Sequence, residues 1–170
     1  TLRRAEDIES ASELIRERLM AIGATQTALV SGSPSSSELG TLVRSAMDLH
    51  AAGPEQVILS GPVIHLDTKT ALGLTLVLHE LGTNAVKYGA LSNDTGRVEI
   101  HWALETPGIA SFLWQEKGGP PAAPPARQGF GTALIQKSLP PVDDAGAEIE
   151  YPPEGVVFRA RLRVAALGAA

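Results

Sequence analysis

The feature that most constrains the fold is a change in the spacing of apolar residues in the middle of the chain. Across residues 71–85 they recur at helical spacing, and the first half of this stretch is apolar on almost every side, which predicts a buried helix. Val98, Ile100 and Trp102 then alternate with polar residues, and a second strand is predicted at 109–114. A buried helix followed by a strand hairpin requires helices packed against a sheet.

Shorter segments complete this pattern. A helix is predicted from Leu39 onward, a strand at 57–60, and a helix cap at Asp67 or Thr68. Two C-terminal strands are predicted at 148–151 and 156–164. In the second of these, one set of side chains faces inward and the other outward: Phe158, Ala160 and Leu162 inward, Arg159, Arg161 and Arg163 outward. The predicted fold class is therefore α+β, a two-layer α/β sandwich with a largely antiparallel sheet.

The N-terminal segment has a different pattern. Residues 6–29 are predicted to form one helix, in which four aliphatic residues stand seven apart and form the narrow seam of a helix that packs on other helices. A Gly, Ser and Pro-rich stretch at 32–37 follows, so we place the domain boundary near 31–36. The predicted organisation is an N-terminal helical unit at 1–33 and a main domain at 34–170.

Composition excludes several classes of function. The net charge is -5 and Lys and Arg are not clustered, which argues against DNA or RNA as partners. The chain has no cysteine, which excludes disulfides and thiolate sites and fits a cytoplasmic location. The longest apolar run, 71–78, is much shorter than the roughly 20 residues of a membrane helix. Because the chain starts at Thr1 rather than Met, we expect it to be a fragment of a longer protein.

Three polar residues share one face of the predicted buried helix. Glu80, Asn84 and Lys87 stand at positions i, i+4 and i+7, and would line two turns. A magnesium–nucleotide site would use all three, because an amide oxygen suits Mg²⁺, a carboxylate can polarise a nucleophile and an ammonium neutralises phosphate. Taken alone, the spacing agrees at least as well with a solvated helix face that carries an incidental Glu–Lys pair.

Two glycine segments favour the nucleotide interpretation. Gly118 and Gly119 follow the strand that contains Trp114, and residues 129–132 open a helix predicted at 132–139. Glycine lets the backbone approach a ligand closely, and the start of a helix presents N–H groups to phosphate. Neither segment is a Walker loop or a dinucleotide-binding fingerprint. Between them, the Pro-rich stretch 118–125 is predicted to be a mobile loop.

Three sequence boxes, each occurring once, resemble those of the HWE histidine kinases, a family named for a His, a Trp and a Glu at these positions. The boxes are His79-Glu80-x-x-x-Asn84, Trp114-x-Glu116-x-Gly118-Gly119-Pro120 and Gly129-Phe130-Gly131-Thr132. The resemblance runs from about residue 38 to 164. It implies the Bergerat ATP-binding fold shared with gyrase-type ATPases and heat-shock chaperones, with helices on one face of a mixed sheet, here preceded by one N-terminal bundle helix.

The same resemblance assigns expected roles to residues. Asn84 would be the Mg²⁺ ligand, Glu80 the acid that assists phosphoryl transfer, and Glu116 the acid that reads the adenine amino group. The other positions expected to bind ATP are Lys87, Tyr88, Gly118, Gly119, Gly129, Phe130, Gly131 and Thr132. His79 and Trp114 are marks of the family for which we favour structural roles: a packed histidine with a backbone partner, and a core or pocket-wall indole.

The implied function is a sensor histidine kinase that transfers the γ-phosphate of ATP to a His, from which an Asp of a response regulator takes it. The chain departs from the family in two ways. No His precedes His50, so the acceptor is expected upstream of Thr1, and Gly82 replaces the usual Ala, which would open space near the pocket. A homodimer through the N-terminal helix is expected. Two alternatives stay open: a serine kinase of the anti-sigma type, and a non-catalytic scaffold on the same fold.

Overall fold

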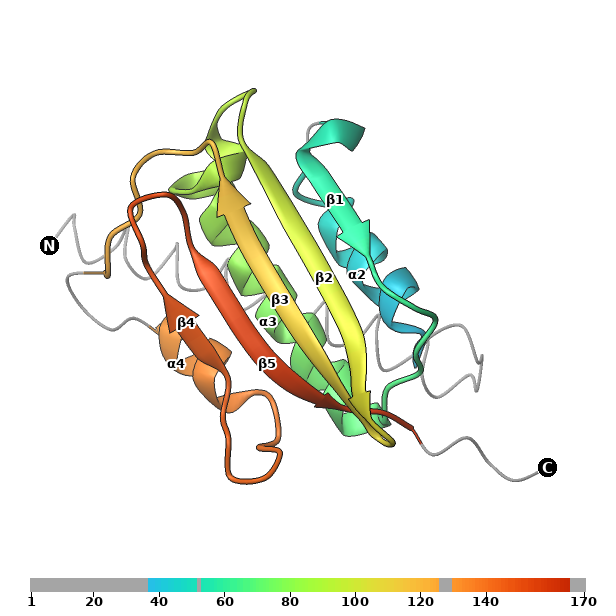
Figure 1. The fold of residues 1–170 in the computed structure, drawn as a ribbon. Helices are drawn as coiled ribbons and strands as arrows, with labels where there is room; N and C mark the ends of the chain where they lie inside the picture. The colour runs from blue at the N-terminus through green and yellow to red at the C-terminus, as the bar shows by residue number, and fades with distance from the viewer. Residues whose placement is uncertain (1–36, 52, 126–129, 166–170) are drawn as a thin grey trace, which may run out of the picture.

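A computed structural model describes residues 37–51, 53–125 and 130–165, and it contains one five-stranded sheet with helices on one face (Figure 1). The strand order is β1-β2-β3-β5-β4. The strands are β1 (Val57–Ser60), β2 (Arg97–Thr106), β3 (Ile109–Lys117), β4 (Glu148–Glu150) and β5 (Val157–Arg163). The helices are α2 (Leu39–Met47), α3 (Thr68–Lys87) and α4 (Phe130–Lys137), with 3-10 turns η2 (Pro54–Gln56) and η3 (Ala90–Ser92). The two-layer α+β prediction is confirmed.

The sheet is mixed and mostly antiparallel. Strand β1 runs parallel to β2, with Val57 beside Val98, whereas every other neighbouring pair is antiparallel. Strands β2 and β3 form the predicted hairpin, but β3 continues to Lys117, three residues beyond the predicted end. Its extra residues include Glu116, so the longer strand determines where one of the predicted site residues lies.

The predicted alternation along the strands is correct. Val98, Ile100 and Trp102 of β2 are buried, as are Phe158, Ala160 and Leu162 of β5. These side chains face the helices and join them in one hydrophobic core, where each large apolar side chain that is fully buried contributes about 1.5–3 kcal/mol. The outward positions of β5 carry the predicted arginines. Arg159 and Arg161 pair with acidic side chains on the open face of the sheet, whereas Arg163 donates to the Pro141 backbone carbonyl.

Helix α3 is the central element of the helical layer, and Figure 1 shows it crossing behind β2, β3 and β5. Asp67 caps it, because its carboxylate accepts a hydrogen bond of 2.8 Å from the Thr70 amide, so the first of the two predicted caps is correct. Its apolar residues Leu74, Val77, Leu78 and Leu81 are at most 1% exposed. Gly73 admits the end of α4, since a β-carbon there would lie 2.3 Å from the Ser138 carbonyl oxygen.

Helix α2 packs beside α3 and begins at the cap of Glu38, whose carboxylate accepts from the Gly40 amide at 2.8 Å. The chain leaves α2 through His50, whose ring lies directly over Gly82: a β-carbon at Gly82 would come within 2.3 Å of it. The expectation that Gly82 opens space near the pocket is therefore wrong, because the imidazole fills that space.

Some predictions fall on residues that are not described. The helix at 6–29, residues 32–36 of the linker and the domain boundary near 31–36 all lie outside the described ranges, as does Gly129. Among the described helices, none combines the length and apolar character that a membrane span needs.

Candidate nucleotide site at the end of helix α3

The C-terminal end of α3 meets the end of β3 at the carboxylate of Glu116. This side chain is 3% exposed, and its Oε2 accepts a hydrogen bond of 2.8 Å from the backbone N–H of Ala90. Ala90 begins the η3 turn that follows α3 directly. The contact joins the turn just after the first sequence box to the second box, although the two residues are 26 positions apart in the chain.

Trp114 holds the other oxygen of the same carboxylate. Its indole Nε1–H donates to Glu116 Oε1 over 3.3 Å, and the Trp114 side chain is completely buried. Residues two apart on a strand face the same side, so the Trp-x-Glu spacing itself brings the indole to the carboxylate. Trp114 is thus a core indole, as expected, and its N–H points to the carboxylate of Glu116, a predicted site residue.

Burial decides the ionisation of Glu116. Removal from water raises the pKa of this carboxyl above 4.5, because burial disfavours the charged form. The hydrogen bonds from Ala90 and Trp114 favour the carboxylate and oppose that rise in pKa. A desolvated carboxyl group at this depth is an unusual core residue, and such groups gather at functional sites.

Glycines allow the backbone to close around this carboxylate. At Gly89 a β-carbon would lie 2.0 Å from Glu116 Oε2, and at Gly119 it would lie 2.6 Å from Ala90 Cα. Gly118 has a φ of 73°, a left-handed conformation that disfavours other residues, and its carbonyl accepts from the Asn93 side chain at 3.1 Å. Of the predicted pair, Gly119 therefore lies directly against the turn that follows α3, and Gly118 lies beside Thr95 and Gly96, just ahead of β2.

The polar stripe on α3 changes in burial along the helix. Glu80 is 4% exposed, Asn84 is half-buried and Lys87 is exposed, and Tyr88 just beyond the helix is 75% exposed. A solvated face cannot account for a carboxylate as buried as Glu80. The stripe leads from the interior of the helical layer to the turn at Gly89, next to Glu116.

The third sequence box opens α4. Phe130, Gly131 and Thr132 form its first turn, so the helix starts two residues before the predicted 132 and ends at Lys137. Helix α4 packs beside α3, with Ser138 against Gly73, and Figure 1 shows it on the same face of the sheet. The loop 118–125 between β3 and α4 has no helix or strand, as predicted from its prolines.

His79, the first of the three family marks, is packed in the helical layer. Its side chain is 9% exposed, and its ring lies 5.3 Å from that of His50, measured between centroids. The two rings are tilted by 54°, and His50 also covers Gly82 one turn along α3. This agrees with the expected packed histidine and explains the glycine at position 82.

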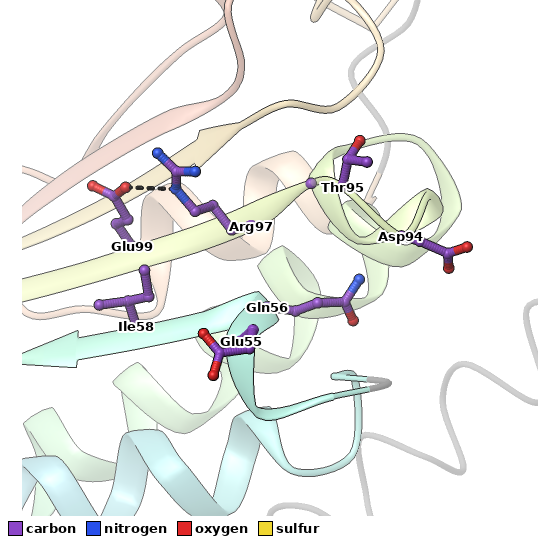
Figure 2. Close-up of a pocket in the computed structure, with 8 residues that line it drawn as sticks. Glu55, Gln56, Ile58, Asp94, Thr95, Arg97 and Glu99 are labelled. Carbon is purple, nitrogen blue, oxygen red and sulfur yellow. Dashed lines mark hydrogen bonds and ion pairs between the residues drawn. The ribbon is translucent and has the colours of Figure 1, made fainter.

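A hollow of about 360 Å³ lies elsewhere, between the start of β1 and the loop before β2 (Figure 2). It is lined by Glu55, Gln56, Ile58, Asp94, Thr95, Gly96, Arg97 and Glu99. None of the predicted ATP-binding residues lines it, and nothing in the sequence pattern indicated it. It is an open, mostly polar depression rather than an enclosed site, so it does not displace the residues around Glu116 as the candidate.

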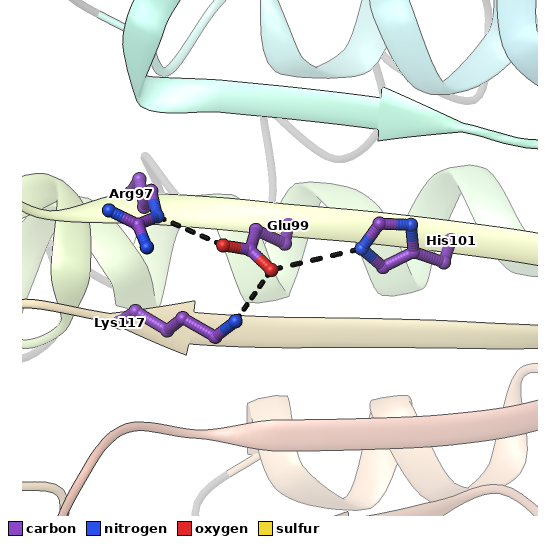
Figure 3. Close-up of polar contacts among 4 residues, drawn as sticks. All are labelled: Arg97, Glu99, His101 and Lys117. Carbon is purple, nitrogen blue, oxygen red and sulfur yellow. Dashed lines mark hydrogen bonds and ion pairs between the residues drawn. The ribbon is translucent and has the colours of Figure 1, made fainter.

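The open face of the sheet carries a charged cluster around Glu99 (Figure 3). Lys117 Nζ and Arg97 Nε lie 2.6 and 2.9 Å from its two carboxylate oxygens, and His101 Nε2 lies 3.8 Å away. The hydrogen bonds from Lys117 and Arg97 lower the pKa of Glu99 to about 2. This cluster is a cross-strand charge network on the face away from the helices.

The residues present fit a magnesium–nucleotide complex. Within the described ranges no three His, Asp, Glu or Cys side chains gather as a metal cluster. Mg²⁺ in nucleotide sites usually takes one or two protein oxygens and completes its shell with phosphate and water. The half-buried amide of Asn84, one turn from buried Glu80, offers an oxygen of this kind.

Comparison with known proteins points in the same direction. Residues 1–63 match the family described as HWE histidine kinase. The chain is 35% identical over 162 residues to a blue-light-activated histidine kinase of Brucella anthropi, and 33% identical to one of Brucella ovis. Each alignment covers 93% of this chain but only 33% of the relative, so the chain spans about a third of their length.

Solved structures show the same fold. The blue-light activated histidine kinase of Erythrobacter litoralis superposes with a TM-score of 0.66 at 16% identity, over 91% of this chain and 50% of that one. A mycobacterial sensor histidine kinase gives a TM-score of 0.55 at 14% identity, over 75% of this chain and 96% of that one. With the His, Trp and Glu that give the family its name at positions 79, 114 and 116, the chain belongs to the HWE histidine kinases.

Proposed function

We propose that this chain is the ATP-binding catalytic part of a two-component sensor histidine kinase. It would bind Mg-ATP and transfer the γ-phosphate to a His on a helix upstream of Thr1. An Asp in the receiver domain of a response regulator would then take the phosphate. Residues 1–33 would be the remnant of the dimerisation domain and 34–170 the catalytic domain, with a homodimer formed through the N-terminal helix. The cytoplasmic location stays a prediction.

One observation carries this proposal: the Ala90 amide and the Trp114 indole hold the buried carboxylate of Glu116 where the α3 turn meets β3. The contact puts the end of the Asn84 helix beside the Gly118–Gly119 turn. An acidic acceptor next to close-packed glycine backbone suits a flat ring with an exocyclic amino group. We therefore assign adenine to this end of α3 and the phosphates to the side of Asn84 and Glu80.

The chain's own residues have distinct proposed roles. Asn84 would hold Mg²⁺, which when bound neutralises phosphate charge, and Lys87 would add a cation from the last residue of α3. Glu80 would polarise the attacking imidazole, a contribution of about 10²–10⁴-fold for a positioned acid or base. The first turn of α4 would present backbone N–H groups to phosphate. Phosphoryl transfer needs mainly positioning and charge neutralisation, so this set is sufficient.

Nucleotide binding is tested by thermal unfolding with and without ATP and Mg²⁺. Ligand at about 100 times its dissociation constant should stabilise the folded chain by about 2.7 kcal/mol. In Asn84→Ala the stabilisation by ATP should no longer depend on Mg²⁺. Glu55→Gln, a matched polar change in the separate hollow, should keep that dependence. Absence of any shift for the unsubstituted chain would contradict the nucleotide assignment, and so would a shift that Asn84→Ala leaves unchanged.

The test of kinase activity uses a longer chain that would carry the proposed acceptor helix. After incubation with γ-labelled ATP, phosphate should appear on His and should be lost in acid. Label that survives acid, on Ser or Thr, would instead favour the serine kinase of the anti-sigma type. A chain that binds ATP but labels neither would favour the non-catalytic scaffold.

A further inference from the structure

We propose that Trp114 is a positioning residue for adenine recognition, acting through its indole N–H on the carboxylate of Glu116. This rests on the proposed function, in which Glu116 reads the adenine amino group. The proposal gives Trp114, the tryptophan of the family name, a role in ligand binding in addition to its packing in the core.

The geometry of the carboxylate carries the inference. A glutamate side chain rotates about three bonds, so a single hydrogen bond leaves it free to turn. Here Oε2 is held by Ala90 N–H at 2.8 Å, and Oε1 by Trp114 Nε1–H at 3.3 Å. The two donors come from different elements and bind different oxygens, which defines the plane of the carboxylate. About four acceptor positions exist on the group, so capacity for a ligand N–H remains.

Trp114 itself is held rigidly. Its side chain is 0% exposed, and its cross-strand neighbours are Ile100 on β2 and Phe158 on β5, both of them fully buried. A donor fixed in this way does not have to reorganise when a ligand arrives, so it supports binding by preorganisation.

The second tryptophan of the chain provides the contrast. Trp102 on β2 is also buried, at 7% exposure, but its Nε1–H donates to the Pro62 backbone carbonyl at 2.8 Å. A tryptophan needed only for packing can satisfy its N–H with backbone in this manner. Trp114 instead donates to an ionisable side chain that has raised pKa and lies beside the Gly89 and Gly119 backbone.

The test couples a change in the protein with a change in the ligand. Mg-ATP and Mg-purine riboside triphosphate, which lacks the 6-amino group, are titrated calorimetrically into the unsubstituted chain, Trp114→Phe and Trp102→Phe. The unsubstituted chain should prefer ATP by about tenfold, the size of one charge-assisted hydrogen bond. In Trp114→Phe the preference should fall to about threefold or less, with the purine ligand bound almost as before. Trp102→Phe, the matched control, should keep the full preference.

The outcomes separate the two proposals. Equal weakening of both ligands in Trp114→Phe, with the preference kept, would mean that the residue only packs, and would overturn the inference while leaving the proposed function in place. Failure of the unsubstituted chain to bind either ligand would overturn the proposed function and the inference with it. If the unsubstituted chain bound both ligands equally, Glu116 would not recognise the 6-amino group of adenine, and the inference would be overturned.

A second measurement does not depend on the folding of Trp114→Phe. The chain has two tryptophans, so Trp102→Phe leaves a single indole N–H resonance in a ¹⁵N NMR spectrum. That resonance should shift when Glu116→Gln is added to the Trp102→Phe background, and also when Mg-ATP binds. An indole resonance that is the same with Glu and with Gln at position 116 would overturn the proposed contact.

Discussion

Gly89 lies so close to Glu116 that a β-carbon on the glycine would come within 2.0 Å of carboxylate Oε2. The same β-carbon would lie 3.0 Å from Ala85 Cα, so it is confined from the helix side as well. Glu116 therefore packs directly against the turn that follows α3, and a larger residue at position 89 would displace its carboxylate.

The first prediction follows from this contact. Gly89→Ala should displace the Glu116 carboxylate and weaken ATP binding by about tenfold or more, the loss expected when one charge-assisted hydrogen bond is misplaced. Overpacking should also cost about 1–3 kcal/mol of unfolding free energy. Calorimetric titration and urea unfolding measure the two effects. Gly146→Ala is the matched control, because a β-carbon there meets no atom within 4 Å. Equal ATP affinity in both variants would contradict the prediction.

The second prediction concerns the pH dependence that Glu116 contributes. Because the folded pKa is raised above 4.5, the folded state binds the proton more tightly than the unfolded state. The stability contributed by protonation is present below pH 4.5 and is lost as the pH rises through the folded pKa. Glu116→Gln does not titrate, so its stability relative to the parent should increase as the pH rises from 4.5 to 8.

Urea unfolding at several pH values measures this difference. ATP affinity should meanwhile fall by about tenfold in Glu116→Gln, since an amide cannot replace the carboxylate as an acceptor for both the indole and adenine. A stability difference that is constant between pH 4.5 and 8 would show that Glu116 is not desolvated in solution.

The third prediction concerns Glu99 on the open face of the sheet. Lys117 and Arg97 depress its pKa from 4.5 to about 2, so its stabilisation is present above pH 4.5 and is lost between pH 4.5 and 2. The Glu99 side chain is 16% exposed and both partners are more exposed, so water screens the cluster strongly.

Glu99→Gln should therefore cost roughly 1 kcal/mol of unfolding free energy at pH 7 and almost nothing near pH 2. Denaturant unfolding at the two pH values gives the difference. In 1 M NaCl the cost at pH 7 should shrink, because salt screens exposed charges. A cost that survives at pH 2 would assign the effect to packing rather than charge.

The fourth prediction concerns the start of α3. Asp67 accepts a hydrogen bond of 2.8 Å from the Thr70 amide, and removing such a cap costs about 0.5–2 kcal/mol. Asp67→Ala should lower the unfolding free energy by this amount, whereas Asp67→Ser keeps a capping oxygen and should lie close to the parent. ATP affinity should hardly change in either variant, since the cap is at the opposite end of the helix from Asn84. Loss of stability in both variants alike would rule out the capping role.

The residues of the candidate site could be predicted from the sequence, but most of the contacts between them could not. Trp114 and Glu116 are two apart on a strand, so their shared face follows from strand geometry. The partner of Glu116 on the other side is a backbone N–H, which carries no side-chain signal, and Ala90 stands 26 residues away. Likewise His50 gave no sign in the sequence of lying over Gly82, a contact that depends on how α2 packs against α3.

The sequence by itself determined the kinds of element and their order, because the period of apolar residues differs between helix and strand and the caps and glycines mark the ends. It also determined the three boxes by which the chain resembles the HWE histidine kinases. The tertiary structure alone decided that the end of α3 abuts β3, that the distant Ala90 N–H holds the Glu116 carboxylate, and that Glu80 is buried. Those contacts join segments distant in the chain, and they form only when the whole helical layer packs on the sheet.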